Sequence, residues 1–311
     1  MRALVVSNLR ADAGAPGRGV FVRDQVAALR ALDGVEVTHF EFPPGPRSLA
    51  RAALTLRRRY RRDHFDVVHA HFGLSAWTSL AVPARARVLT VHGTDVRHPR
   101  TGHLTAAVLP RMTLVAAVSA SLLGELPAGG PRGQRAVLPC GVDLDRFQPQ
   151  PRAQARTALG LDPSGPYLLF PADPRRVGKR HDRALELAGD TPLLTLGAVP
   201  PRDVPRWINA ANAVVVPSEA EGFGLAVLEA LACDVPVLAT DVGIHALALR
   251  DVAGTLCAPY ERNGWRAALA PHLAAADPRI AGRGRAELFS ARRMAERVLI
   301  AWRSLLPDAA H

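Results

Sequence analysis

The sequence predicts an α/β protein of two doubly wound domains that face each other across a cleft. A chain of 311 residues is too long for one ordinary domain and suits two domains of ~150 residues each. Short β-branched runs alternate with longer amphipathic stretches, and this pattern restarts after residue 150. Such alternation is typical of parallel sheets with helices on both faces, where ligands bind at the carboxyl ends of the strands.

The first half carries a series of expected strands and clear helical patterns. Apolar positions recur at i, i+3 and i+4 from Phe21 to Leu32, which predicts a helix, and a second helix is expected over 48–62. Strands are expected at 3–6, 35–40, 66–69, 87–91, 114–119 and 136–139.

The polar, proline-bearing segment Gln148-Pro-Gln-Pro151 is typical of a domain boundary. We therefore expect Rossmann-like domains over 1–148 and 149–289, and a C-terminal helix over 290–311 that can cross back to the first domain. In the second domain, strands are expected at 167–170, 193–196, 213–216, 235–239 and 254–257, and helices at about 179–188, 203–211, 224–233 and 261–275.

The composition excludes several classes of protein. With 48% hydrophobic and 22% charged residues, the chain is typical of a soluble globular protein rather than a disordered one. No apolar run approaches the ~18–20 residues that a membrane span needs, and the first apolar stretch is too short for a secretory signal. The three cysteines show no paired spacing, so neither a disulfide framework nor a zinc cluster is expected. We expect a cytoplasmic protein.

The net charge of +11 is unevenly distributed. Residues 1–150 hold 20 basic and 11 acidic residues (+9), and residues 151–311 hold 19 and 17 (+2). This excess favours an anionic partner. Nucleic acid is not expected, because aromatic residues make up only 5% and do not alternate with basic ones. All basic residues except Lys179 are arginine, so Lys179 stands there either by accident or because its site needs a compact ammonium.

The most informative segment runs from Pro217 to Ala232. An apolar strand leads into a glycine-bearing loop and then into a helix, whose N-terminus is suited to bind an anion. The helix is apolar on every side except at Glu229, so we expect it to be buried. A buried carboxylate needs a partner, either a ligand's hydroxyl groups or a structural arginine. Glu221 and Glu229 are spaced so that both can contact one ligand at the helix N-terminus.

This segment resembles the Glu-x7-Glu signature of retaining glycosyltransferases of family 4, which have the GT-B fold. Further resemblances extend over nearly the whole chain: Gly17-Arg-Gly-Val-Phe-Val-Arg23, Asp66-Val-Val-His-Ala-His71, Thr90-Val-His-Gly-Thr-Asp95, Gly141-Val-Asp-Leu-Asp-Arg-Phe147 and Pro236-Val-Leu-Ala-Thr-Asp-Val-Gly243. The resemblance implies that the first domain binds the acceptor and that the second binds a nucleotide sugar.

The resemblance also implies roles for individual residues. Glu229 would hold the ribose hydroxyls of the donor. Glu221 would contact the transferred sugar, close to the amides of Phe223, Gly224 and Leu225. Other residues implied in the site are Lys179 at the diphosphate, Gly17 and Gly19 in a loop that approaches the donor, and His92 near the reacting sugar.

The chain departs from the family pattern at several positions. An arginine commonly lies five or six residues before the lysine, where this chain has Pro174 and Asp173, and Arg175 or Arg176 is the expected substitute. The other departures are Cys140 for Asn, Asp234 for Gly, and Ile244-His-Ala246 in place of a Gly and a Glu.

The resemblance favours front-face transfer with retained configuration, with neither a metal ion nor a cofactor beyond the donor itself. We interpret Asp143-Leu-Asp145 as structural, and His69 and His71 as strand-end side chains rather than metal ligands. Two alternatives remain open: a nucleotide-sugar epimerase on the same fold, and a degenerate sugar-nucleotide binding protein.

A basic cluster ends the predicted helix over 48–62. It contains Arg57, Arg58, Arg59, Arg61 and Arg62 around a tyrosine. Such a cluster is either a solvated helix end or a surface that contacts anionic lipid. In the second case, the protein would bind peripherally to the inner face of the membrane.

Overall fold

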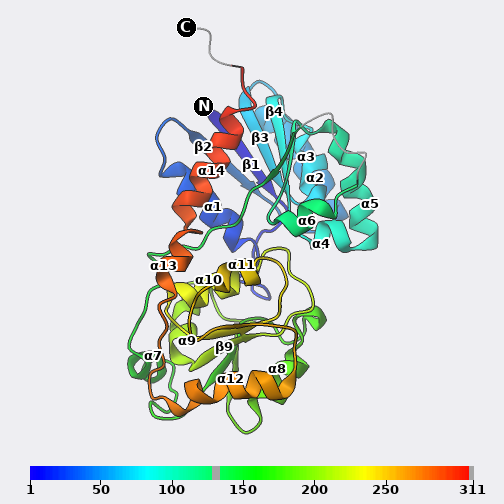
Figure 1. The fold of residues 1–311 in the computed structure, drawn as a ribbon. Coiled ribbons are helices and arrows are strands. Elements are labelled where there is room, and N and C mark those ends of the chain that lie inside the picture. Colours follow the sequence, from blue (N-terminus) through cyan, green and yellow to red (C-terminus); the bar gives the residue numbers. More distant parts are fainter. Residues whose placement is uncertain (128–133, 308–311) are drawn as a thin grey trace. The chain divides into compact units, whose positions relative to one another are not determined.

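The computed structural model describes residues 1–127 and 134–307, which fold into two compact α/β units (Figure 1). The first unit consists mainly of Met1–Asp12, Arg18–Gly141 and the segment from Ala291 onward, and the second mainly of Val142–Ser290. Residues 142–148, which we expected in the first domain, belong to the second unit. The Arg283 guanidinium donates to the carbonyls of Leu144 at 2.9 Å and Phe147 at 2.8 Å.

The first unit contains a parallel sheet with the strand order β2-β1-β3-β4-β5-β6. Side chains of β1 alternate between its faces: Ala3 and Val5 enter one core, and Leu4 and Val6 enter the other. The strands are β1 (Arg2–Ser7), β2 (Glu36–Glu41), β3 (Phe65–His71), β4 (Ala84–Val91), β5 (Leu114–Ala117) and β6 (Gln134–Val137). Strand β3 is longer than the 66–69 expected and includes His71.

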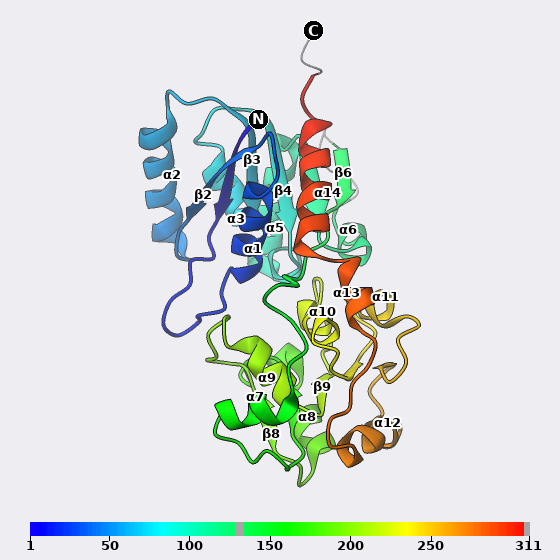
Figure 2. The ribbon, with the colours of Figure 1, turned by 90° about the vertical axis from the view of Figure 1, so that its left-hand side faces the viewer.

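Helices cover both faces of this sheet (Figure 2). On one face, α1 (Val20–Arg30) packs beside α14 (Ala291–Arg303), whose Trp302 is fully buried. On the other face, α2 (Pro46–Tyr60) buries Leu56 and Tyr60. The remaining helices of this unit are α3 (Gly73–Ser79), α4 (Thr94–Arg97), α5 (Pro99–Val108), the 3-10 turn η1 (Leu109–Arg111) and α6 (Ala120–Gly124). Positions 308–311 of the predicted last helix lie outside the described residues.

The second unit contains a parallel sheet with the order β11-β10-β9-β7-β8. Its strands are β7 (Leu168–Phe170), β8 (Leu193–Thr195), β9 (Ala213–Val216), β10 (Val237–Ala239) and β11 (Leu256–Cys257). Helices α8 (His181–Ala188) and α12 (Arg262–Ala274) pack on one face, where Trp265 is buried. The other helical elements are α7 (Arg152–Ala158), η2 (Val177–Lys179), α9 (Val204–Ala210), α10 (Leu225–Ala232), α11 (His245–Leu249) and α13 (Arg283–Glu287).

One helix start differs from the prediction. The helix expected over 179–188 begins at His181, and Lys179 ends the short 3-10 turn η2 before it. Arg180 separates the two elements because its φ of 57° lies in the left-handed region. The Lys179 side chain therefore projects from a turn rather than from a helix.

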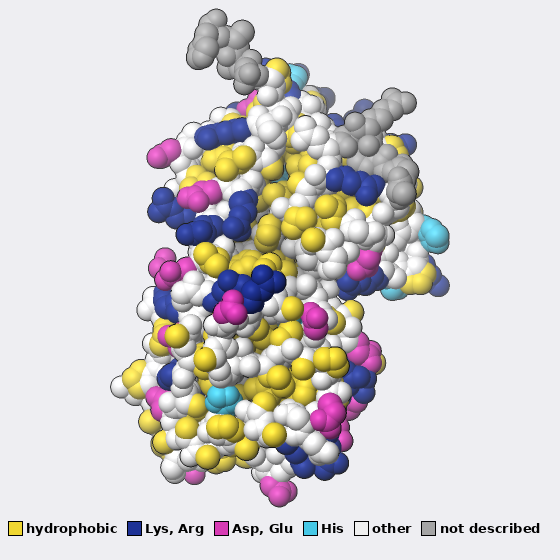
Figure 3. All heavy atoms as spheres, in the orientation of Figure 1, with side chains coloured by type: hydrophobic (Ala, Val, Ile, Leu, Met, Phe, Trp, Pro, Cys, Tyr) yellow, Lys and Arg dark blue, Asp and Glu magenta, His cyan; other side chains and the backbone are white. Residues whose placement is uncertain are grey.

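The surface of the described residues has mixed character. On the face drawn in Figure 3, basic side chains lie in several separate groups among acidic and hydrophobic ones. Within residues 1–127 and 134–307, no helix is both long and apolar enough to cross a membrane. Cys140, Cys233 and Cys257 are not bonded to one another.

Candidate functional site

Lys179 and Glu221 form an ion pair in the second unit. Lys179 Nζ lies 2.5 Å from Glu221 Oε1, and the two side chains are only 18% and 10% exposed. Ser218 Oγ donates a hydrogen bond to the same carboxylate oxygen at 2.8 Å. Burial raises the pKa of Glu221, but the charge and hydrogen bond of Lys179, together with Ser218, outweigh it and hold this pKa below its usual value. Glu221 is therefore a charged carboxylate with an ammonium beside it.

Two arginines hold the loop that carries this pair. Arg180 forms ion pairs with Glu219 at 2.5 Å and with Asp182 at 2.6 Å. Arg183 donates to the carbonyl of Pro217 at 3.3 Å, and the Glu219 amide donates to the carbonyl of Gly178 at 3.0 Å. These contacts join the η2 turn to the loop that follows β9. Sequence reasoning missed both arginines, although Arg180 directly follows Lys179.

A second loop, after β10, packs against the first. Gly243 has φ 63°, and a Cβ there would lie 2.2 Å from the carbonyl oxygen of Phe223. The amide of Ile244 donates to that oxygen at 2.9 Å, and Thr240 Oγ1 donates to the carbonyl of Ser218 at 2.5 Å. Only glycine fits at position 243 because a side chain would separate the two loops.

Gly224 begins helix α10 in a conformation that favours glycine. Its φ is 109°, and a Cβ at this position would lie 2.4 Å from Nε2 of His245. The N–H groups of the first turn of α10 lack a carbonyl four residues earlier within the helix, and that of Val227 donates to the Gly224 carbonyl at 3.2 Å. The predicted amides of Phe223, Gly224 and Leu225 therefore lie at a helix N-terminus, which is suited to an anion.

Helix α10 is not buried on every side, which corrects the prediction. Val227, Leu228 and the Ala230–Ala232 run are buried, whereas Leu225, Ala226 and Glu229 are half-buried. Positions i, i+1 and i+4 share one face of a helix, so this face is partly accessible to solvent. Glu229 therefore lies on the accessible stripe of an otherwise apolar helix.

Arg175 is placed differently from Lys179. Its side chain is 82% exposed and forms an ion pair with Asp173 at 2.8 Å. The guanidinium holds the pKa of Asp173 down, at about 2. Arg175 and Lys179 are thus brought to the same loop, but only Lys179 contacts Glu221.

In the first unit, His92 lies at the carboxyl end of β4 within an aromatic setting. Its ring stacks on Phe72 at 4.8 Å and approaches Phe21 of α1 at 4.7 Å between ring centroids. His92 Nε2 is 3.0 Å from Nδ1 of His71, which is fully buried at the end of β3. Burial lowers the pKa of both histidines well below the usual value. Repulsion from His71 lowers the pKa of His92 further, and repulsion from His69 and His39 lowers that of His71. Both imidazoles are therefore neutral at pH 7.

A buried carboxylate fixes the His92 loop. Asp95 Oδ1 accepts the amides of His92 at 2.9 Å and Gly93 at 3.0 Å, and Oδ2 accepts the amide of Gly73 at 3.2 Å. Asp95 thus ties the end of β4 to the start of α3. Phe72, the residue directly before α3, has a φ of 72°, a conformation that an aromatic residue rarely adopts. This conformation accompanies the stacking of Phe72 on His92.

His69 has a defined tautomer because of its two partners. Trp302 Nε1 donates to His69 Nδ1 at 3.2 Å, and His69 Nε2 lies 2.7 Å from Thr90 Oγ1. An indole N–H can only donate, so Nδ1 accepts and Nε2 carries the proton. Burial lowers the pKa of His69 to about 3. His69 is therefore a core residue that joins α14 to the sheet.

The predicted glycine loop lies between β1 and α1. Gly19 caps α1 with φ 72°, and a Cβ there would lie 2.5 Å from the carbonyl oxygen of Leu9. Gly17 has open space where a side chain would project. Gly19 thus starts the helix that brings Phe21 to His92, whereas no contact requires glycine at position 17.

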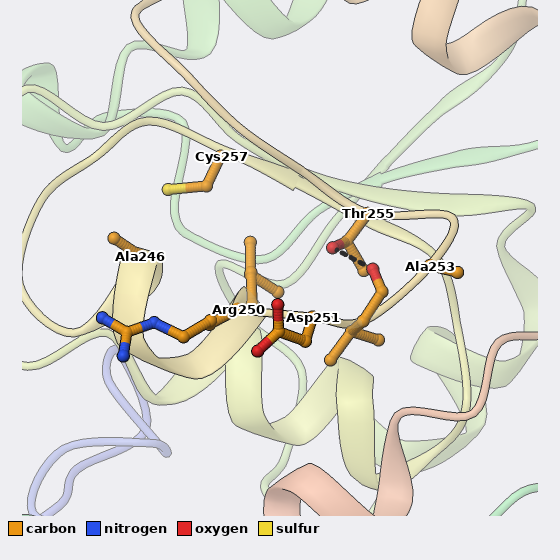
Figure 4. A pocket seen from close by; sticks show the side chains of 8 residues that line it. Ala246, Arg250, Asp251, Ala253, Thr255 and Cys257 are labelled. Carbon is orange, nitrogen blue, oxygen red and sulfur yellow. Dashed lines mark hydrogen bonds between the residues drawn. The ribbon is translucent and has the colours of Figure 1, made fainter.

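Two hollows lie away from the Lys179–Glu221 pair and from His92. A cavity of about 590 Å³ is lined by Ala246, Arg250, Asp251 and Cys257, among others, where α11 is followed by β11 (Figure 4). Thr255 Oγ1 donates to the carbonyl of Val252 at 2.8 Å in its wall. A second cavity, of about 450 Å³, is lined by Leu54, Arg57, Arg58 and Arg61 of the α2 region. None of the other predicted site residues lines either one.

The described part of the chain contains no group of three or more His, Cys, Asp or Glu side chains placed to hold a metal ion. Asp143 Oδ1 instead accepts the amides of Asp145 and Arg146, both at 3.0 Å. The Asp143-Leu-Asp145 motif therefore forms a local turn.

In the second unit, the cation of Lys179, the carboxylate of Glu221 and the N-terminus of α10 lie together. This arrangement is suited to a ligand with both anionic and hydroxyl groups.

Nearly the whole chain is similar to known proteins. Residues 9–146 match the family model described as Glycosyltransferase Family 4, and residues 174–275 match the model described as Glycosyl transferases group 1. A D-inositol 3-phosphate glycosyltransferase from Actinosynnema mirum is 32% identical over 91% of this chain and 82% of its own length.

Solved structures share the fold of both units. A sucrose-phosphate synthase from Thermosynechococcus elongatus has a TM-score of 0.76 at 22% identity and covers 98% of this chain and 99% of its own. Anabaena HepE, solved in complex with UDP-glucose, has a TM-score of 0.68 at 17% identity and covers 98% of this chain and 100% of its own.

Proposed function

The chain belongs to glycosyltransferase family 4 and has the two-domain GT-B fold, and we propose that this glycosyltransferase is a retaining, metal-independent enzyme. Its donor would be a nucleotide-diphosphate sugar, its acceptor a hydroxyl group, and its transferred group a hexose. The solved structure of Anabaena HepE with UDP-glucose supports this donor class, because that protein has the same fold.

The Lys179–Glu221 pair at the start of α10 is the observation that carries the proposal. Departure of a nucleoside diphosphate requires stabilisation of the negative charge that grows on its phosphate. Lys179 supplies a compact cation, and the N-terminus of α10 supplies oriented N–H groups. Arg180 and Arg183, which are paired with Asp182 and Glu219, hold the loop cluster in place around Lys179.

Other residues would hold the sugar nucleotide in place. The half-buried Glu229 would accept hydrogen bonds from the ribose hydroxyls, and Glu221 would bind hydroxyl groups of the transferred sugar. The amides of Phe223 and Leu225 flank Gly224, whose lack of a side chain leaves room for the ring of His245 beside the start of α10. In the first unit, His92, neutral and held by His71, would contact the reacting sugar or the acceptor.

The reaction that we propose is front-face displacement through an oxocarbenium-like transition state. The bond between the anomeric carbon and the phosphate oxygen breaks, and the bond from that carbon to the acceptor oxygen forms on the same face. The departing phosphate takes the acceptor proton. No nucleophilic carboxylate of the enzyme is used, so Glu221 and Glu229 bind rather than attack.

A thermal-shift screen with UDP, GDP, ADP and dTDP sugars tests the donor class. A donor present at 100 times its Kd should stabilise the fold by about 2.7 kcal/mol. The change should be lost when Lys179 and Glu229 are both replaced by neutral residues. Absence of a shift with all four donor classes would contradict a nucleotide-sugar donor.

Two further measurements test the finer parts of the proposal. The anomeric configuration of the product, determined by NMR, should match that of the donor; an inverted product would exclude the retaining mechanism. Turnover should persist in excess EDTA. Loss of turnover in EDTA and its return with Mg²⁺ or Mn²⁺ would contradict metal independence.

The basic end of α2 suggests where the acceptor comes from. Arg57, Arg58 and Arg61 line a hollow together with Leu54, whose side chain is 57% exposed. An exposed apolar side chain among arginines suits the boundary of an anionic lipid surface. We therefore propose a cytoplasmic enzyme that binds peripherally to the inner face of the membrane.

A further inference from the structure

His245 is a fully buried histidine at the start of α11. Its Nδ1 lies 2.8 Å from the carbonyl oxygen of Thr240. A carbonyl can only accept, so Nδ1 carries a hydrogen and Nε2 is the unprotonated nitrogen of the neutral ring. Among the residues that the structure describes, none offers a hydrogen-bond partner to Nε2. His245 can therefore accept one proton at a defined atom.

That nitrogen lies beside Gly224, at the start of α10. Nε2 occupies the space beside Gly224 where a Cβ would come within 2.4 Å of it. The charges that act on the ring are Glu221 and Asp241, which favour its protonation, and Lys179, which opposes it. Arg285 of α13 contacts α11 through the carbonyl of Leu247. Burial dominates these effects and lowers the pKa of His245, so the ring is neutral while Lys179 pairs with Glu221.

An anionic ligand changes the charges that determine whether His245 is protonated. Lys179 Nζ is already bound to Glu221 Oε1, so a diphosphate that binds the same ammonium weakens this ion pair. Glu221 is buried, and a buried carboxylate that loses its counter-ion is strongly destabilised. A second positive charge beside Glu221 would remove that penalty. His245, whose Nε2 has no hydrogen-bond partner among the described residues, is able to acquire one.

We propose that His245 replaces Lys179 as the counter-ion of Glu221 when an anion draws the ammonium away. The proton comes from solvent and binds to Nε2, and no covalent bond changes. This inference rests on the proposed function in that the natural anion is taken to be the diphosphate of the donor. It adds a residue that takes up charge during donor binding, at a position where the chain departs from its family.

The first experiment uses no ligand. Lys179→Met removes the ammonium but keeps an unbranched side chain as far as its ε atom, and the ring signals of His245 are followed by NMR against pH. We expect the titration midpoint of His245 to rise by about one pH unit or more relative to the wild type. Adding Glu221→Gln should reverse this rise, and His245→Asn identifies the signal by its loss.

A matched control removes a cation that contacts Glu219 rather than Glu221. Arg183→Met should leave the His245 midpoint near its wild-type position. The proposal is overturned if Lys179→Met leaves the midpoint unchanged, or if Arg183→Met raises it equally. Either result would mean that the Lys179–Glu221 pair does not control the protonation of His245.

The second experiment measures protons taken up with the ligand. Calorimetry is carried out at pH 7 in two buffers of different ionisation enthalpy, with whichever of UDP, GDP, ADP and dTDP binds. The wild type should take up more protons than His245→Asn, and equal uptake by both would overturn the proposal. If none of the four binds, the proposed donor class fails, whereas the ligand-free titration still decides the role of His245.

Discussion

His71 Nδ1 lies 3.0 Å from His92 Nε2, so a buried imidazole holds the ring that reaches the carboxyl end of β4. His92 also stacks on Phe72, which has a φ of 72°. Asp95 binds the backbone on both sides of this arrangement. The ring of His92 is therefore fixed by a hydrogen bond, a stacking contact and a backbone clamp.

Replacing His71 should affect turnover more than donor binding. His71→Phe keeps a ring but loses the hydrogen bond, and we expect kcat to fall about tenfold or more through misplacement of His92, with little change in the KM for the donor. His71→Asn keeps a polar group near Nδ1 and should recover part of kcat. His64→Asn, at an exposed position, is the control. A His71→Phe enzyme with wild-type kcat would exclude this positioning role.

Mild acid should destabilise the first unit. The folded-state pKa values of His69, His71 and His92 are lowered, that of His69 to about 3. The free energy of unfolding is therefore not reduced by these histidines above the unfolded-state pKa of ~6.5. As pH falls below this value, it decreases by about 1.4 kcal/mol per pH unit for each histidine. Denaturant titrations between pH 7 and 5 measure this slope. His69→Gln should reduce it, and an unchanged slope in that variant would contradict the assignment.

Lys179 should have separable effects on stability and on turnover. Lys179→Ala removes the counter-ion of a buried carboxylate, so we expect a loss of about 2 kcal/mol or more in the free energy of unfolding and loss of most turnover. Adding Glu221→Gln should restore stability but not turnover. Lys179→Arg should recover turnover only in part, because a planar fork does not replace a compact ammonium. Full turnover by Lys179→Ala would remove this residue from the diphosphate site.

Glu229→Gln should weaken donor binding without unfolding the protein. Charged hydrogen bonds contribute ~1.5–3 kcal/mol, so donor affinity should fall about tenfold to a hundredfold. The melting temperature without ligand should change little, because Glu229 is only half-buried and Gln keeps its size and one acceptor oxygen. Glu296→Gln on α14 provides a control with the same chemical change. A less stable protein with unchanged donor affinity would indicate that Glu229 is structural.

The basic end of α2, with Arg57, Arg58 and Arg61, should bind anionic vesicles in a salt-dependent way. Each basic residue near an anionic surface contributes roughly 1 kcal/mol, and salt screens exposed charges within about 8–10 Å. Co-sedimentation should fall when Arg57, Arg58 and Arg61 are replaced by Gln. The same change at Arg292, Arg293 and Arg297 on α14 removes equal charge elsewhere. Equal binding by both triple variants would contradict docking through α2.

Much of the fold could be predicted from local pattern. Alternation in β1 sends Ala3 and Val5 to one face and Leu4 and Val6 to the other, and this periodicity is visible in the sequence. The strand–loop–helix segment around Glu221 and Glu229 could also be predicted from local pattern, because an apolar strand, glycines and a helix follow one another without interruption. Helices α3 to α6 are short and mixed in composition, so periodicity gave little indication of them.

Contacts between distant segments could not be predicted in this way. Arg175 and Arg180 are both near Lys179 in sequence, but Arg175 faces solvent, whereas Arg180 reaches Glu219, because the left-handed turn at Arg180 sets the direction of its side chain. His245 meets Gly224 only because Gly243 lets the two loops approach.

The sequence by itself determined the alternation of strands and helices, the family, and the residue types available for binding a sugar nucleotide. These depend on neighbouring residues, whose spacing is fixed by the covalent chain. The tertiary structure decided that Lys179 pairs with Glu221, that His71 holds His92, and that α14 packs beside α1. These contacts join residues far apart in the chain, and packing determines which of many chemically suitable partners actually meet.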